Sequence, residues 1–176
     1  MVKLNLGCHN SIRPGYVNID KDKYPGVDLV ADVFKLDYAD NSVAEIYASH
    51  IIEHAPHVRT LEILKGWHRL LVTDGILKIS VPDFDRTIEI YLKDGLKDWI
   101  VNFLWGDQGY EGAFHYCGFN EERLTKLLRQ AGFTDISRVE RLPGNLSDEC
   151  SNLVSNIDGK FVCLNIIAVK DNICPL

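Results

Sequence analysis

Short apolar runs alternate with amphipathic segments along the 176 residues of the chain. The runs are typical of buried strands, and the segments carry apolar residues at helical spacing. We expect strands over residues 3–8, 16–20, 29–32, 43–49, 75–82, 137–142 and 161–170, and helices over 59–72, 83–92, 96–105 and 121–131. This alternation predicts one open, mostly parallel α/β sheet. No repeat or linker divides the sequence, so residues 1–176 are interpreted as a single domain.

Turn and capping signals separate these elements. Asn120 is a helix-capping residue and Gly132 ends the helix that follows it, while Thr73-Asp74-Gly75 has the composition of a turn. A glycine-rich stretch over residues 106–118 is interpreted as a loop, and so is the long connection over 143–159. The order of elements therefore predicts where strands end, and ligands of open α/β sheets bind beyond the carboxyl ends of the strands.

Charge and composition exclude several partners. The formal charge of -6 and the pI near 5.5 have the wrong sign for a domain that binds nucleic acid through its phosphates. The amino-terminal residues show no signal-peptide pattern and no run is long enough to cross a membrane, so we expect a cytoplasmic protein. The five cysteines have no disulfide spacing and are expected to be free thiols.

Chemically versatile residues follow several of the predicted strands. Gly7, Cys8 and His9 lie at the end of the first strand, and Asp20 closes the second. A glycine at this position allows the backbone to approach a ligand, and an acid at the end of the second strand can accept both hydroxyls of a ribose. The alternative is that Gly7 only makes a turn and that Asp20 only caps a strand end.

Several motifs in order resemble the class I S-adenosylmethionine-dependent methyltransferases, and most closely their small "type 11" group. They are LNLGCHNS, GYVNID, LVAD with KLDYADNSVAEIYASHIIEH, LKGWHRLLVTDGILKISVPDFD and FNEERLTKLLRQAGF, which together span about residues 3–133. The resemblance implies a Rossmann-like sheet of seven strands with an antiparallel edge hairpin at the carboxyl end. It also implies S-adenosylmethionine as cofactor, lying across the tips of the first, second and fourth strands.

The resemblance also implies a role for particular positions. Gly7, Cys8 and His9 would face the methionine part of the cofactor, and Asp20 would bind its ribose. Asp32 and Val33 would border the adenine. Ser49 and His50 would line the side of the cofactor that carries the sulfonium.

The sequence departs from the family pattern at the glycine turn. Only Gly7 remains of the usual glycines, and His9 places a ring where close approach is usual. This departure supports an alternative function, a catalytically degenerate module that keeps the methyltransferase fold. Calorimetry with S-adenosylmethionine distinguishes the two functions.

The connection between the first two strands is unusually short. Eight residues, 9–16, span at most about 27 Å, whereas returning along a five-residue strand needs roughly 17 Å. An extended segment can make this crossover but a helix cannot. We therefore expect the first crossover helix to be absent, and another segment or the second subunit of a homodimer to cover the face that it leaves open.

Methyl transfer from a sulfonium needs a general base only for some acceptors, such as a hydroxyl or a protonated amine. His115 is the first candidate, because GAFHYCGF precedes the late helix where the family often has a histidine, and Tyr116, Asp83 and His54 follow. The alternative is that His115 only orders its loop. We expect a small-molecule acceptor with a reactive oxygen or nitrogen, and the resemblance suggests a sugar or glycolipid intermediate.

Two further patterns in the sequence offer alternatives to this interpretation. His50, His54 and His57, with Cys8 and His9 on a neighbouring strand, could form a zinc or iron site, but their spacing matches no metal motif and we expect no metal. Asp83 and Asp85 spell the D-x-D of metal-dependent nucleotide-sugar transferases. The helical spacing after Asp83 favours a helix cap instead.

Overall fold

The computed structural model describes residues 1–143 and 162–171, which form a seven-stranded sheet of order β3-β2-β1-β4-β5-β7-β6. The first five strands in this order are mutually parallel, and β7 is antiparallel to both of its neighbours. This confirms the predicted α/β sheet with an antiparallel hairpin at one edge. The strands are β1 (Val2–Leu6), β2 (Val17–Asp20), β3 (Leu29–Val30), β4 (Val43–Ser49), β5 (Leu71–Pro82), β6 (Phe133–Val139) and β7 (Cys163–Lys170).

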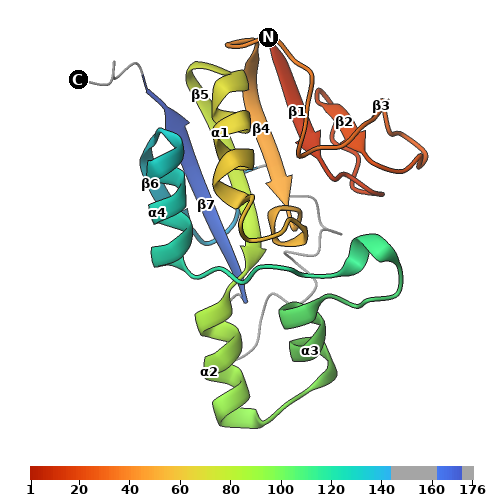
Figure 1. Cartoon of the computed structure of the whole chain (residues 1–176), viewed down its shortest axis with the longest axis vertical. Coiled ribbons are helices and arrows are strands. Elements are labelled where there is room, and N and C mark those ends of the chain that lie inside the picture. The colour runs from red at the N-terminus through yellow and green to blue at the C-terminus, as the bar shows by residue number, and fades with distance from the viewer. Residues whose placement is uncertain (144–161, 172–176) are drawn as a thin grey trace.

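The helices lie on one face of the sheet and beyond its carboxyl edge (Figure 1). Helices α1 (Thr60–Leu70) and α4 (Glu121–Ala131) cover the face, whereas α2 (Phe84–Asp94) and α3 (Asp98–Trp105) extend past the tip of β5. Two 3₁₀ turns, η1 (Ile52–His54) and η2 (Glu111–Ala113), lie in the loops at the same edge. The loops and helices that could form a site therefore gather where the parallel strands end.

The core forms between the helices and aligned rows of apolar residues on the sheet. In one row Leu4 of β1 is paired with Ile46 of β4, and Ile46 with Leu77 of β5. A second row runs through Leu6, Ala48 and Ile79, and all of these side chains are buried. They belong to one cluster with Trp67 of α1 and Leu128 of α4. The alternation of strand side chains thus puts the apolar set on the face that α1 and α4 cover.

Parallel neighbours β1 and β2 are joined without a helix, as their short connection predicts. The connecting segment instead hydrogen-bonds to the second face of these strands. Asn18 of β2 accepts hydrogen bonds from the main-chain N–H of Arg13 and from the side-chain amide of Asn5, at 2.8 and 2.9 Å. The amide of Asn5 also donates to the carbonyl of Ser11. The connection therefore covers the strands that it joins.

This second face of the sheet is polar where the connection covers it. Glu45 of β4 is ion-paired with Lys78 at 2.7 Å and with Lys3 at 3.6 Å, and it accepts a hydrogen bond from the Tyr16 hydroxyl. Burial and this hydrogen bond raise the pKa of Tyr16. The guanidinium of Arg13 lies 3.3 Å from the ring centroid of Tyr47. The connecting segment itself therefore covers this polar part of the sheet, and the homodimer stays an expectation.

Some observed boundaries differ from the predicted ones. The predicted turn at Thr73-Asp74-Gly75 lies inside β5, where Asp74 has a φ of 59° and the register with β4 shifts. These residues form a bulge, because the flanking residues pair with β4 on both sides. Strand β6 begins at Phe133 rather than at residue 137 and ends at Val139 rather than at 142. The buried ring of Phe133 anchors the strand directly after the helix cap.

The capping predictions are confirmed. The side chain of Asn120 accepts a hydrogen bond from the N–H of Arg123, and Gly132 ends α4 with a φ of 106°.

The cysteines that the structure describes are free, as expected. These are Cys8, Cys117 and Cys163, and all three are buried. Cys150, Cys174 and most of the 143–159 connection lie outside the described residues. Among the described residues, every helix is too short or too polar to traverse a membrane.

The role of Asn18 can be tested by substitution. Asn18→Ala removes the side-chain amide that accepts hydrogen bonds from Asn5 and from the N–H of Arg13. Because these buried donors lose their partner, we expect the free energy of unfolding to fall by about 2–4 kcal/mol. Chemical denaturation measures the change. Asn102→Ala, on the exposed side of α3, is the matched control and should change stability by less than about 0.5 kcal/mol. Equal effects of the two substitutions would contradict the proposed role.

Candidate active site

The turn after β1 ties the ends of β1, β2 and β4 together. Gly7 has a φ of 64°, and a β-carbon built on it would lie 2.5 Å from the side chain of Ile51, beyond β4. The N–H of Cys8 donates to the carbonyl of Ile19 at 3.1 Å, and the N–H of His9 donates to the carboxylate of Asp20 at 2.8 Å. Glycine is required here both for the left-handed backbone and for the contact with Ile51.

Asp20 lies at the tip of β2 with its side chain oriented by the backbone. One carboxylate oxygen accepts from the N–H of His9 and the other from the N–H of Asp22, at 2.8 and 3.0 Å. The residue is 8% exposed. Each carboxylate oxygen has room for a second hydrogen bond. Asp20 can therefore still accept a pair of hydroxyl groups.

Cys8 and His9 are both oriented toward β2. Burial, together with the charge of Asp20, raises the pKa of the Cys8 thiol to about 11, so this thiol is protonated and unreactive at neutral pH. The His9 ring packs edge-on against Tyr24, with 4.3 Å between centroids. The main-chain N–H groups of both residues are used inside the protein. The turn thus holds Asp20 but offers neither of these donors to a ligand.

The two residues predicted to border the adenine differ in their exposure to solvent: Asp32 is exposed and Val33 is buried. Asp32 is exposed, and its side chain accepts from the N–H of Phe34 within its own turn. Val33 is 5% exposed and lies in the core, with its carbonyl accepting from the indole N–H of Trp67. Only Asp32 therefore has a side chain at the surface where an adenine could lie.

Ser49 is the last residue of β4 and His50 follows it, with its ring turned toward β7. His50 adopts a φ of 52°, and its Nε2 lies 3.3 Å from the sulfur of Cys163. Its Nδ1 lies 3.2 Å from Oε1 of Glu53. Burial opposes a charge on this ring, but Cys163 and Glu53 outweigh it and raise the pKa of His50 well above its ordinary value. His50 is thus placed to carry a buried charge beside Glu53.

Glu53 is a buried carboxylate that lies among histidines from two loops. Its side chain is fully buried, and one donor atom each of Glu53, His54 and His115 lie within 4.8 Å of one another. Burial favours the neutral acid, but His50 and the other two histidines lower the pKa of Glu53 overall. Burial lowers the pKa of His115, which is therefore neutral at pH 7. His57 is exposed and lies outside this cluster.

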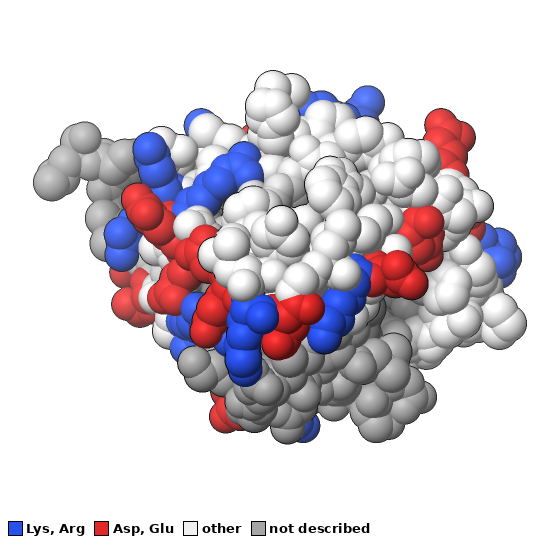
Figure 2. Space-filling view, turned by 90° about the horizontal axis from the view of Figure 1, so that it is seen from below, with Lys and Arg blue, Asp and Glu red and all other residues white. Residues whose placement is uncertain are grey.

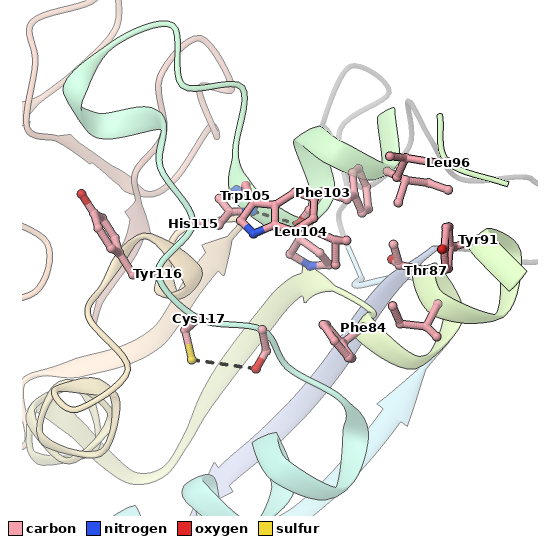
Figure 3. Close-up of a pocket in the computed structure, with 14 residues that line it drawn as sticks. Phe84, Thr87, Tyr91, Leu96, Phe103, Leu104, Trp105, His115, Tyr116 and Cys117 are labelled. Carbon is pink, nitrogen blue, oxygen red and sulfur yellow. Dashed lines mark hydrogen bonds between the residues drawn. The ribbon is translucent and has the colours of Figure 1, made fainter. Parts of the chain in front are cut away.

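An apolar cavity of about 640 Å³ lies next to this cluster, between α2, α3 and the loop segment 115–118 (Figure 3). His115 lies in its wall beside Trp105. Aromatic and aliphatic side chains form most of the remaining wall, among them Phe84, Tyr91, Leu96 and Phe103. Seen from this end, the molecule has a broad area without charged side chains (Figure 2). The cavity suits a ligand with an apolar part.

Tyr116 and Asp83 are two further predicted catalytic residues. Tyr116 is half exposed and lies in the cavity wall, and its ring stacks on Phe114 with 6.3 Å between centroids. Asp83 is 3% exposed, accepts from the N–H of Arg86 as the cap of α2, and is ion-paired with Arg138 at 2.7 Å. This confirms the helix-cap interpretation of Asp83.

The D-x-D interpretation finds no support in this geometry. Both oxygens of Asp83 already have donors, and Asp85 accepts from the side-chain amide of Asn120. The two carboxylates are therefore engaged in holding α2 and α4 rather than directed together at a cation.

Loop 106–118 connects the cavity to the tip of β2. Its base is closed by a hydrogen bond from the N–H of His115 to the carbonyl of Trp105 at 3.0 Å. Farther along, the ring of Tyr110 lies 5.5 Å from the Lys21 ammonium, next to Asp20. One loop thus bounds both the cavity and the region around Asp20.

Sequence reasoning missed two residues that the structure makes central, Glu53 and Cys163. The signal for Glu53 was a single acid among Ile51, Ile52 and Ala55, a pattern that indicates a buried carboxylate. Cys163 carries no local signal, because its contact with His50 joins positions far apart in the sequence.

Comparison with known proteins identifies the fold. No protein-family model matches the chain, and neither does any curated protein. A solved methyltransferase from Archaeoglobus fulgidus that depends on S-adenosylmethionine (SAM) has a TM-score of 0.62 at 16% identity, over 96% of this chain and 85% of that one. One from Methanosarcina mazei gives 0.61 at 20% identity, over 96% and 92%.

A third solved structure is the 1,6-didemethyltoxoflavin-N1-methyltransferase of Burkholderia thailandensis, with bound acceptor and S-adenosylhomocysteine. It has a TM-score of 0.59 at 20% identity, over 97% of this chain and 71% of that one. At such identities the likeness concerns the fold alone. The chain has the class I SAM-dependent methyltransferase fold, as its motifs predicted, while the type 11 likeness stays an expectation.

The closure of loop 106–118 can be tested at its first glycine. Gly106 has a φ of 80°, and an added β-carbon would overlap the carbonyl of Ala113. We expect Gly106→Ala to lower the free energy of unfolding by about 2–4 kcal/mol, as measured by chemical denaturation.

Gly109→Ala is the matched control in the same loop. Its added β-carbon would approach only the side chain of Asp107, at 3.4 Å, so we expect a change within about 0.5 kcal/mol. If both variants were as stable as the parent, the loop would not be closed at Gly106.

Proposed function

We propose that this protein binds SAM and transfers its methyl group to an oxygen or nitrogen of a small-molecule acceptor. The observation that carries the proposal is Asp20, a buried carboxylate at the tip of β2 whose two oxygens can each accept one more hydrogen bond. In a methyltransferase fold this is the position from which an acid can accept both ribose hydroxyls. The fold and the side-chain chemistry therefore support the same ligand.

The residues around Asp20 fit the adenosine half of this cofactor better than its amino-acid half. Asp20 would hold the ribose, and the exposed turn at Asp32 borders the neighbouring surface. The N–H groups of Cys8 and His9 are already bonded to Ile19 and Asp20, so other donors must hold the methionine carboxylate. When bound, the cofactor supplies a methyl group on a sulfonium, which is activated without help from the protein.

The chain's own contribution to the reaction is to orient an acceptor and to exclude water. The apolar cavity next to loop 106–118 can do both, since its wall is largely aromatic and aliphatic. A sugar or glycolipid intermediate with an apolar part is the acceptor that we propose. His115 has a neutral ring in the cavity wall. Its ring nitrogen can accept a proton from a hydroxyl or an ammonium, or hold a cation that polarises the acceptor.

A degenerate module that binds without turnover is the second candidate function. It is favoured by the turn after β1, where His9 replaces a glycine and its N–H is committed to Asp20. This candidate predicts weak or absent binding of the cofactor. The affinity for SAM therefore separates the two functions.

Calorimetric titration with SAM tests the proposal. We expect micromolar binding by the parent protein, and Asp20→Ala should weaken it by about 1–3 kcal/mol, or roughly 5- to 150-fold, because hydrogen bonds to a charged group are lost. Asp22→Ala is the matched control, since Asp22 uses its main-chain N–H rather than its side chain to contact Asp20.

Two results would contradict the proposal. The parent protein could release no heat at millimolar SAM, which would favour the degenerate module. Asp20→Ala could bind as tightly as the parent, which would remove Asp20 from the site. Thermal unfolding of both variants distinguishes a lost contact from a lost fold.

A further inference from the structure

Three hydrogen-bond acceptors face one another at the edge of the cavity. A carboxylate oxygen of Glu53 and one ring nitrogen each of His54 and His115 lie within 4.8 Å of one another. The two rings meet edge to face, with centroids 4.7 Å apart. They come from separate segments, since His54 ends η1 and His115 follows η2. Tertiary folding alone brings these groups together.

Main-chain contacts determine which nitrogen of each ring carries the proton. Nδ1 of His54 lies 3.0 Å from the carbonyl of Phe114, and Nδ1 of His115 lies 2.9 Å from the carbonyl of Phe103. A carbonyl only accepts, so each Nδ1 must donate. In a neutral ring Nε2 then keeps an unprotonated lone pair. Histidines that bind metals have this arrangement, with the second nitrogen donating to a carbonyl or carboxylate.

The carboxylate of Glu53 has unused capacity toward the same point. The side chain is fully buried, and in the described part of the chain its Oε2 accepts no hydrogen bond. The ionic contact with His50 Nδ1 is made by the other oxygen, Oε1. A buried carboxylate oxygen without a donor is costly, and it is tolerated where a cation or a proton completes it. One nitrogen of each ring and one carboxylate oxygen thus lie close enough together to share a positive charge.

We propose that Glu53, His54 and His115 bind one divalent transition-metal ion of the zinc or iron(II) kind. Two imidazoles and one carboxylate are a ligand set for these ions, and such a set leaves coordination positions open. His115 also lies in the wall of the apolar cavity, so an open position can face a ligand held there. A metal ion at this place can polarise an acceptor hydroxyl.

The required adjustment is small. In tetrahedral zinc sites, ligand atoms about 2.0–2.1 Å from the metal are about 3.3 Å from one another. The donor atoms here lie within 4.8 Å of one another, so each pair must approach by at most about 1.5 Å to reach this spacing. His50 contacts the Glu53 carboxylate through Nδ1 and the Cys163 sulfur through Nε2, so these residues help to hold the carboxylate in place.

This site differs from the one that the histidine spacing suggested. His57 is exposed, and Cys8 and His9 contact β2 instead. The inference reverses our sequence-based expectation of no metal, and it rests on the contacts of Glu53, His54 and His115 alone. It does not require that the protein transfer methyl groups.

Binding of Co²⁺ as a spectroscopic probe tests the site. The purified chain, stripped with a chelator, should bind one Co²⁺ per chain with visible absorption bands, and equimolar Zn²⁺ should displace it. We expect His54→Ala and His115→Ala each to weaken binding on the order of 100-fold or more. His57→Ala is the matched control from the same segment and should bind like the parent.

The inference is overturned if the stripped parent chain binds no Co²⁺ or Zn²⁺. It is also overturned if His54→Ala and His115→Ala bind as tightly as His57→Ala, which would place the metal elsewhere. Circular dichroism verifies that each variant is folded, and Glu53→Gln, which keeps the side-chain shape, provides a third test if one histidine variant unfolds. Because the titration contains no SAM, its failure is separate from a failure of the proposed function.

Discussion

The short connection between β1 and β2 is the constraint on which the cofactor side of this structure depends. Neighbouring parallel strands are usually joined by a helix, but the residues between Leu6 and Val17 are too few to form one and return along the strand. The segment runs extended and must satisfy its own backbone groups on the sheet. Buried asparagines on β1 and β2 serve this purpose, which makes that face of the sheet polar.

The short connection also determines how Asp20 is oriented in the candidate ligand site. The segment leaves β1 through the left-handed turn at Gly7, and its next N–H groups are bonded to β2, including the one from His9 to Asp20. Asp20 is thereby oriented by the connection rather than by a helix. The N–H groups that orient it are no longer free to bind a ligand. The loss of the helix therefore explains both the order of Asp20 and the sparse donors beside it.

The apolar cavity depends on a different feature, a loop that closes on itself and on η1. Loop 106–118 is anchored at Trp105 and at Glu53, whose carbonyl accepts from the N–H of Tyr116 at 2.8 Å. This anchoring brings His115 to the cavity wall and to the buried carboxylate of Glu53. A buried carboxylate among histidines is weak evidence for stability, because desolvation offsets much of the attraction. Stability alone therefore does not account for a fully buried carboxylate at this place.

The sequence by itself determined the layered α/β fold, the caps of α4 and the missing first helix. These features depend on local periodicity, on capping residues such as Asn120 and on the reach of a chain of known length, all of which can be read along the sequence. The tertiary structure decided that His50 turns to Cys163, that Val33 enters the core, and that His115 meets Glu53 and His54. Such contacts join segments far apart in sequence, and they depend on loop paths and packing that no local pattern records.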